Sequence, residues 1–137
     1  MTGIVIVTHT RLGEALIEAA EFILGVQPES VVFVSIDLNE NAKKLRQKIA
    51  KGIKQVDKNK GVLILTDMFG GTPSNLSYSF LDEGNIEVLS GVNLPILIKA
   101  INIRGKMDLT EIAKNLEVHG KKSISLASRI LKGNKES

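Results

Sequence analysis

The chain has 137 residues, with 18 basic and 15 acidic side chains, a formal net charge of +3 and no cysteine. This length suits one domain with its own core, and the lack of cysteine excludes disulfides and thiol chemistry. The mild charge and the scarcity of aromatic residues argue against a nucleic-acid surface. Because no segment resembles a membrane span or a signal peptide, we expect a cytoplasmic protein.

Short apolar runs alternate with amphipathic stretches in the first half of the chain. The β-branched run at 4–7 predicts a strand buried on both faces, and the apolar spacing over 12–24 predicts a helix that Gly25 ends. A second strand is expected at 31–36. It is followed by a helix that begins near Asn39 and Glu40 and continues to Val56.

The same alternation continues in the second half. A third strand at 61–65 ends at Thr66 and Asp67, and Thr72 is expected to cap a helix that Pro73 begins and that ends near Leu81. Further along, the patterns predict a strand at 86–89, a helix at 94–103, a last helix with a capping box at Asp108 and Glu111, and a weaker strand at 123–126.

This alternation of strands and helices predicts the α/β class, with a mostly parallel sheet and helices on both faces. For a chain this short the flavodoxin-like strand order 2-1-3-4 is favoured. We expect residues 1–130 to form a single domain and residues 131–137 to form a polar tail.

The candidate site follows from this strand order. Ligands of open α/β sheets bind beyond the carboxyl ends of the strands, at the point between the first and third strands in this order. His9 and Asp67 stand at those two ends. A carboxylate that accepts a hydrogen bond from one ring nitrogen leaves the other nitrogen free to act as base, ligand or nucleophile. A histidine that only caps a strand end is the plainer alternative.

The loop after Asp67 adds an anion site to this pair. Gly70 and Gly71 let backbone N–H groups approach a ligand, and Thr72 supplies a hydroxyl at the start of the following helix. A tight turn that simply requires glycine is an equally good explanation of the loop taken alone.

Several other chemistries lack their motifs. The chain has neither the P-loop nor the dinucleotide glycine pattern, no hydrolase elbow around its serines, and only one further histidine, His119. A histidine, an aspartate and an anion site together favour phosphoryl transfer through His9, with no metal or other cofactor.

Three stretches carry a resemblance to a known family: GIVIVTHTRLGEALIEAAEFILG, GVLILTDMFGGTPSNLS and SGVNLPILIKA. They resemble the EIIA component of the mannose family of the bacterial phosphoenolpyruvate-dependent sugar phosphotransferase system. The resemblance implies that His9 carries a phosphoryl group on Nε2, that Asp67 orients its ring, and that Gly70, Gly71 and Thr72 lie at the phosphate.

The resemblance also implies partners. The phosphoryl group would come from the phosphocarrier HPr and pass to a separate EIIB protein, which serves the membrane components EIIC and EIID. Family members are homodimers that exchange a C-terminal antiparallel edge strand, and residues 123–126 are the stretch that would play this part here.

One residue departs from the family pattern, and two other functions remain open. The family usually has glycine directly after the active histidine, whereas this chain has Thr10, which we expect to cap the first helix. The alternatives are a regulatory module that senses phosphorylation and the similar domain that serves a dihydroxyacetone kinase, although the GGTP loop argues against the latter. The sugar is not identified by the sequence.

Overall fold

The structure is a computed structural model that describes residues 1–133. Its centre is a four-stranded parallel sheet in the order β2-β1-β3-β4, which confirms the predicted class and order. The strands are β1 (Gly3–His9), β2 (Val31–Ile36), β3 (Val62–Thr66) and β4 (Ile86–Ser90). The helices are α1 (Leu12–Leu24), α2 (Ala42–Val56), α3 (Thr72–Tyr78), α4 (Leu94–Ile103), α5 (Leu109–Lys122) and α6 (Ala127–Lys132).

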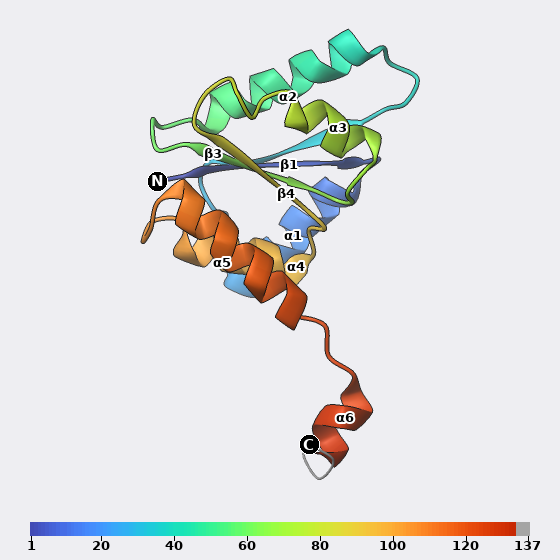
Figure 1. Cartoon of the computed structure of the whole chain (residues 1–137), viewed down its shortest axis with the longest axis vertical. Coiled ribbons are helices and arrows are strands. Elements are labelled where there is room, and N and C mark those ends of the chain that lie inside the picture. Colours follow the sequence, from blue (N-terminus) through green and yellow to red (C-terminus); the bar gives the residue numbers. More distant parts are fainter. Residues whose placement is uncertain (134–137) are drawn as a thin grey trace.

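Helices cover both faces of the sheet, as Figure 1 shows: α2 and α3 lie on one face, and α1, α4 and α5 lie on the other. Alternate residues of the buried strands explain this arrangement, since successive side chains of a strand point to opposite faces. Ile4 and Ile6 of β1 belong to the core under α4 and α5, whereas Val5 and Val7 belong to the core under α2. The chain continues from β1 through α1 to β2 on one side of the sheet and from β3 through α3 to β4 on the other, so the switch point lies between β1 and β3.

The beginnings of two helices differ from the sequence expectations, and the beginning of a third agrees with them. α2 begins after Asn41, whose side chain accepts a hydrogen bond from the Lys44 N–H at 2.8 Å, so the cap lies two residues beyond Asn39. Asp108 caps α5 by accepting from the Glu111 N–H at 2.9 Å, as predicted. The prediction that Thr72 caps α3 is wrong: Gly71 has the extended backbone of a cap, and Thr72 is already helical.

The end of α3 also differs, because the helix stops at Tyr78 and not near Leu81. The Ser79 hydroxyl donates to the Leu76 carbonyl at 2.7 Å, and the Ser79 N–H bonds to the same carbonyl. These contacts tighten the last turn and end the regular helix.

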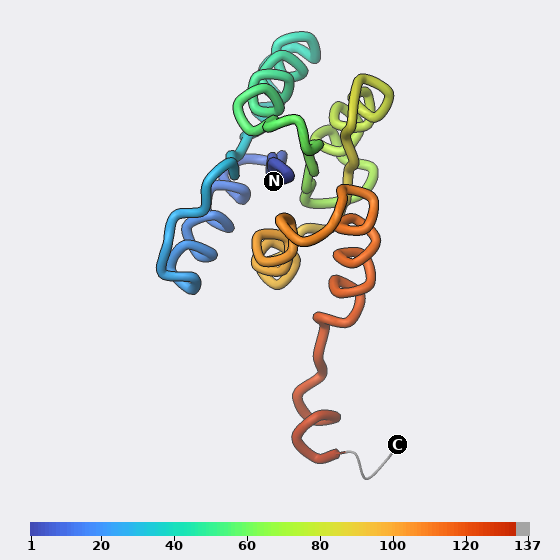
Figure 2. Tube along the Cα trace, turned by 90° about the vertical axis from the view of Figure 1, so that its left-hand side faces the viewer, coloured from blue at the N-terminus to red at the C-terminus, as the bar shows by residue number. Residues whose placement is uncertain are grey.

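The C-terminal part of the described chain leaves the body of the molecule. Residues 123–126 form no strand in the sheet of their own chain, so the weaker strand prediction is wrong for a single copy. They form a connection to α6, which the sequence pattern did not predict and which Figures 1 and 2 show away from the helical layers. Part of the predicted tail, residues 134–137, lies outside the described residues.

Within residues 1–133, no helix has the length and apolar composition needed to cross a membrane.

Candidate functional site

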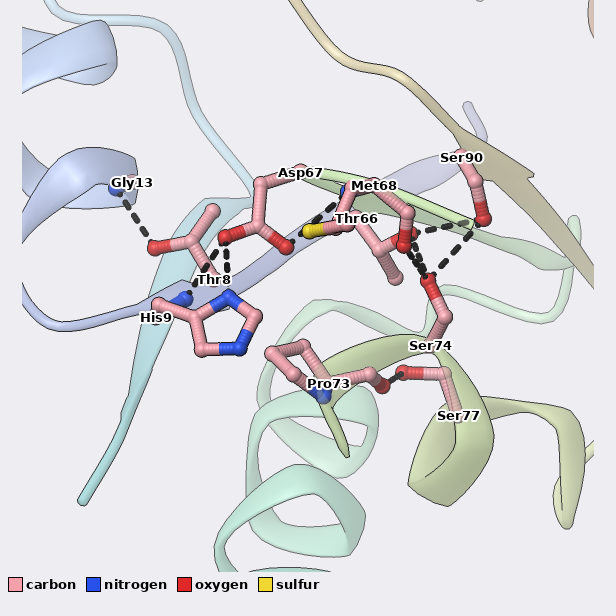
Figure 3. Close-up of polar contacts among 10 residues, drawn as sticks. All are labelled: Thr8, His9, Gly13, Thr66, Asp67, Met68, Pro73, Ser74, Ser77 and Ser90. Atoms are coloured by element: carbon pink, nitrogen blue, oxygen red, sulfur yellow. Dashed lines mark hydrogen bonds and ion pairs between the residues drawn. The ribbon is translucent and has the colours of Figure 1, made fainter. Parts of the chain in front are cut away.

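His9 and Asp67 meet at the carboxyl edge of the sheet, as the strand order predicts. His9 is the last residue of β1, and Asp67 directly follows β3, the neighbouring strand. One carboxylate oxygen, Asp67 Oδ2, accepts a hydrogen bond from the His9 backbone N–H at 2.8 Å and lies 2.7 Å from the ring nitrogen Nδ1 (Figure 3). The carboxylate thus fixes both the backbone and the ring of His9.

This contact determines which nitrogen of a neutral His9 ring carries the proton. A carboxylate has no hydrogen to donate, so Nδ1 must donate, and the lone pair is left on Nε2. The His9 side chain is 35% exposed and the Asp67 side chain 11%. The ring is therefore accessible to a partner, while the group that orients it lies mostly inside the protein.

The pKa of the Asp67 carboxyl reports the same arrangement. Burial alone would raise it, but the hydrogen bonds from the His9 backbone N–H and ring, with the charge of that ring, outweigh burial and bring the pKa below its ordinary value of 3.8. Asp67 is consequently a stable carboxylate acceptor at neutral pH.

Glycine is needed at the two loop positions, 70 and 71, for different structural reasons. Gly70 has a φ of +87°, which is a conformation that favours glycine. Gly71 has an ordinary φ, but a Cβ at this position would lie 3.0 Å from Cε1 and 3.6 Å from Nε2 of His9. The Gly71 backbone therefore lies directly against the free edge of the ring, and Thr72 begins α3 beside it.

Thr10 does not cap α1, contrary to the sequence prediction. It has a φ of +48°, and the cap position is occupied by Arg11, which makes no side-chain cap bond. Thr8 instead supplies a hydrogen-bond acceptor for the first turn of α1, because its buried hydroxyl accepts from the Gly13 N–H at 2.8 Å. A left-handed backbone at this position explains why glycine suits it.

Sequence reasoning missed the polar groups beneath the site. Thr8 and Thr66 are fully buried, and each directly precedes a candidate site residue. Ser74, Ser90 and Tyr78 join Thr66 in a cluster of hydroxyls under the loop. The sequence does contain a signal for these groups, since each of the two apolar runs is followed by a threonine directly before a candidate site residue, in VTH and in LTD.

Two other features of the described chain, a cavity and a buried arginine, lie away from His9 and Asp67. A cavity of about 490 Å³ lies at the opposite, amino end of the strands, lined by residues that include Lys60, Asn85 and Arg104, so it is remote from His9. The buried Arg104 donates from Nη1 to the Ser30 carbonyl and from Nη2 to the Glu29 carbonyl, which gives it a structural role. In residues 1–133, no three His, Asp or Glu side chains are grouped to hold a metal ion.

Comparisons with known proteins agree on one family. The EIIA-man family model, described as "PTS system fructose IIA component", matches residues 3–117. The fructose-specific EIIA component of Bacillus subtilis is 30% identical, over 96% of this chain and 90% of its own length. The mannose-specific EIIAB component of Escherichia coli is 39% identical over 74% of this chain, and the match spans 32% of that longer protein.

Solved structures show the same fold. The EIIA component from Streptococcus agalactiae has a TM-score of 0.83 at 27% identity, with 93% of this chain and 98% of that chain covered. The mannose/sorbose-specific IIA subunit from Enterococcus faecalis, at 21% identity and a TM-score of 0.81, covers 91% and 93% and supports the fold. This chain belongs to the mannose family of EIIA components of the sugar phosphotransferase system.

Proposed function

We propose that this protein is a phosphocarrier that accepts a phosphoryl group from phosphorylated HPr on Nε2 of His9 and passes it to an EIIB partner. The observation that carries the proposal is the 2.7 Å contact between Asp67 Oδ2 and His9 Nδ1, which leaves Nε2 as the free nucleophile. Membership of the EIIA-man family supports a role in sugar transport. The relatives are named for fructose, mannose and sorbose, and we assign no sugar.

The proposed reaction is a simple exchange of one phosphorus–nitrogen bond for another. The lone pair of His9 Nε2 attacks the phosphorus in line, and the bond from phosphorus to the donor's ring nitrogen breaks with its electron pair returning to that nitrogen. The Nδ1 proton stays in its hydrogen bond to Asp67 throughout, so the carboxylate balances the positive charge that develops on the ring. Transfer to EIIB is the same exchange in the opposite sense.

Gly70, Gly71 and Thr72 are the proposed phosphate-binding residues. The closeness of Gly71 to the ring supports this role, since a Cβ added to Gly71 would lie 3.6 Å from His9 Nε2. Backbone N–H groups and the Thr72 hydroxyl can donate hydrogen bonds to phosphoryl oxygens at that place. The chemistry requires no metal ion, and a chelator should leave the transfer rate unchanged.

The exposed apolar residues in the loops after β2 and β3, at the same edge of the sheet as His9, suit a protein donor better than a small molecule. Met68 and Phe69, in the loop that carries Asp67, are 55% and 79% exposed, and Leu38 of the loop after β2 is 67% exposed. Apolar groups of this kind are common at protein–protein interfaces. EIIC and EIID would then be reached only through EIIB.

We also propose that the protein is a homodimer in which residues 123–126 pair antiparallel with β4 of a second copy. β4 is an edge strand of the sheet, and a cavity of about 290 Å³ beside it is lined in part by Leu89, Ile96 and Ile124. Ile124 is 83% exposed, and Leu126 has an extended backbone. Strand exchange would satisfy the open edge and cover these side chains.

The test is phosphorylation by phosphoenolpyruvate, enzyme I and HPr, followed by addition of an EIIB protein. Wild type should acquire an acid-labile phosphoryl group that is lost to EIIB, and His9→Ala should acquire none. Asp67→Ala should still fold but accept the group at least about tenfold more slowly. An unlabelled wild type would contradict the proposal, and a labelled protein that never releases its phosphoryl group would favour the regulatory alternative.

A further inference from the structure

Four hydroxyl groups meet under the loop that carries Asp67. They come from Thr66 at the end of β3, Ser90 at the end of β4, and Ser74 and Tyr78 on α3. Ser74 Oγ lies 2.6 Å from Thr66 Oγ1 and 3.0 Å from Ser90 Oγ (Figure 3). This hydroxyl cluster therefore joins two strand ends and one helix at a single point, directly behind the candidate site.

Ser74 connects the hydroxyl cluster to the loop. Its hydroxyl donates to the Met68 carbonyl, which can only accept. A serine has one hydroxyl proton, so while Ser74 donates it to Met68 it can only accept in its contacts with Thr66 and Ser90. The side chain is completely buried, and bulk water cannot readily replace these bonds.

Met68 in turn holds the carboxylate. Its backbone N–H donates to Asp67 Oδ1 at 3.0 Å, while Asp67 Oδ2 accepts both hydrogen bonds from His9. Met68 is thus fixed on both sides, by Ser74 at its carbonyl and by Asp67 at its N–H. Two sets of hydrogen bonds, joined by the backbone of Met68, thus connect the hydroxyl cluster to Asp67 and to Nδ1 of His9.

We propose that Ser74 is a positioning residue for His9, acting through Met68 and Asp67. It holds the loop in the conformation in which both oxygens of Asp67 are engaged, and thereby keeps the His9 proton on Nδ1. The orientation of His9 follows from the described contacts, whereas its consequence for phosphoryl transfer rests on the proposed function. Ser74 itself touches no reacting atom.

The chain provides a closely matched control in Ser77. This serine is also completely buried and also lies on α3, but its hydroxyl donates to the Pro73 carbonyl of its own helix at 2.7 Å. Replacing either serine by alanine removes one buried hydroxyl from the same helix. Only the Ser74 substitution breaks the connection to Met68.

The first measurement is the tautomer of the His9 ring in the unphosphorylated protein, read from its ¹⁵N chemical shifts by NMR. Wild type and Ser77→Ala should show the Nδ1–H form as the main neutral species, and Ser74→Ala should show a clear rise in the Nε2–H form. An unchanged tautomer ratio in a folded Ser74→Ala protein would overturn the proposal. If that variant fails to fold, Ser74→Cys, which keeps the shape with a weaker donor, takes its place with the same expected direction.

The second measurement is the rate of phosphoryl acceptance in single and double variants. Ser74→Ala should slow acceptance about tenfold and Ser77→Ala less than about twofold, because a misplaced ring loses its alignment for attack. In the Asp67→Ala background the Ser74 substitution should have little further effect, since its route to His9 is already cut. Equal slowing in both backgrounds would show a general structural role and overturn the proposal. A wild type that accepts no phosphoryl group would refute the proposed function and leave the tautomer comparison to decide the role of Ser74.

Discussion

At the scale of single residues, the site depends on small backbone groups as much as on His9 and Asp67. Gly71 illustrates this, because its backbone φ is ordinary and only the closeness of the His9 ring demands glycine. At Gly70 the reverse holds: a positive φ demands glycine, although a Cβ added there would have nothing within 4 Å. The two adjacent glycines, which look equivalent in the sequence, therefore protect different features of the site.

Substitution of Gly71 should damage activity more than stability. In Gly71→Ala the new methyl group lies 3.0 Å from His9 Cε1, so the ring must move away from its place against Asp67. We expect phosphoryl acceptance to fall at least about tenfold, because attack on phosphorus depends on alignment. Gly105→Ala is the control, since an added Cβ there has nothing within 4 Å. Equal rates for the two variants would contradict this explanation of Gly71.

Thr10 carries a conformational cost that glycine would remove. It is an exposed, β-branched residue at a φ of +48°, and such a backbone is unfavourable for all residues with a Cβ. Thr10→Gly should raise the free energy of unfolding by about 1 kcal/mol, after allowance for the greater freedom of glycine in the unfolded chain.

Chemical denaturation of three proteins tests the Thr10 prediction. Thr10→Ala serves as the control, because alanine keeps a Cβ and should retain most of the unfavourable conformation. A Thr10→Gly protein no more stable than Thr10→Ala would show that backbone conformation is not the cause.

At the scale of elements, the strand order could be predicted because it depends on apolar patterns that are visible in the sequence. The juxtaposition of His9 and Asp67 followed from that order, since both residues stand at strand ends. The hydroxyl cluster could not be predicted in the same way. Ser74 and Ser90 are ordinary residues of a helix and a strand, and only the packing of α3 against the ends of β3 and β4 brings them together.

Asp67 joins the ends of two strands, and this link should weaken in acid. Its pKa is lowered on folding, so the carboxylate stabilises the protein at pH values above 3.8, and this contribution is lost as the pH falls through the lower, folded-state pKa. The stability difference between wild type and Asp67→Asn should therefore shrink as the pH falls below about 4. Urea denaturation at a series of pH values measures it.

A matched substitution separates this link from general acid effects. Asp82 is an exposed aspartate, and Asp82→Asn should change stability by less than about 0.5 kcal/mol throughout the series. If wild type and Asp67→Asn lost stability in parallel down to pH 3, the carboxylate would not be the acid-sensitive link between the strands.

At the scale of the whole molecule, the described chain has two features that one copy leaves incomplete. β4 forms an open edge of the sheet, and the segment from Ser123 to α6 leads away from the body. The sequence indicated a strand at 123–126 from its alternation, but a strand needs a neighbour, and the same chain offers none there. The prediction failed for one copy because strand formation depends on a partner that the local sequence cannot specify.

Truncation at two positions tests whether a second copy supplies that neighbour. The wild type should have twice the mass of one chain by light scattering, and a chain that ends at Lys122 should be monomeric because it lacks the segment that pairs with β4. A chain that ends at Ala127 keeps residues 123–126 but loses nearly all of α6, and it should remain dimeric. A monomeric Ala127 truncation would assign the contact to α6 instead. A dimeric Lys122 truncation would show that the copies associate through another surface, and the exchange of strands would then be excluded as the basis of the dimer.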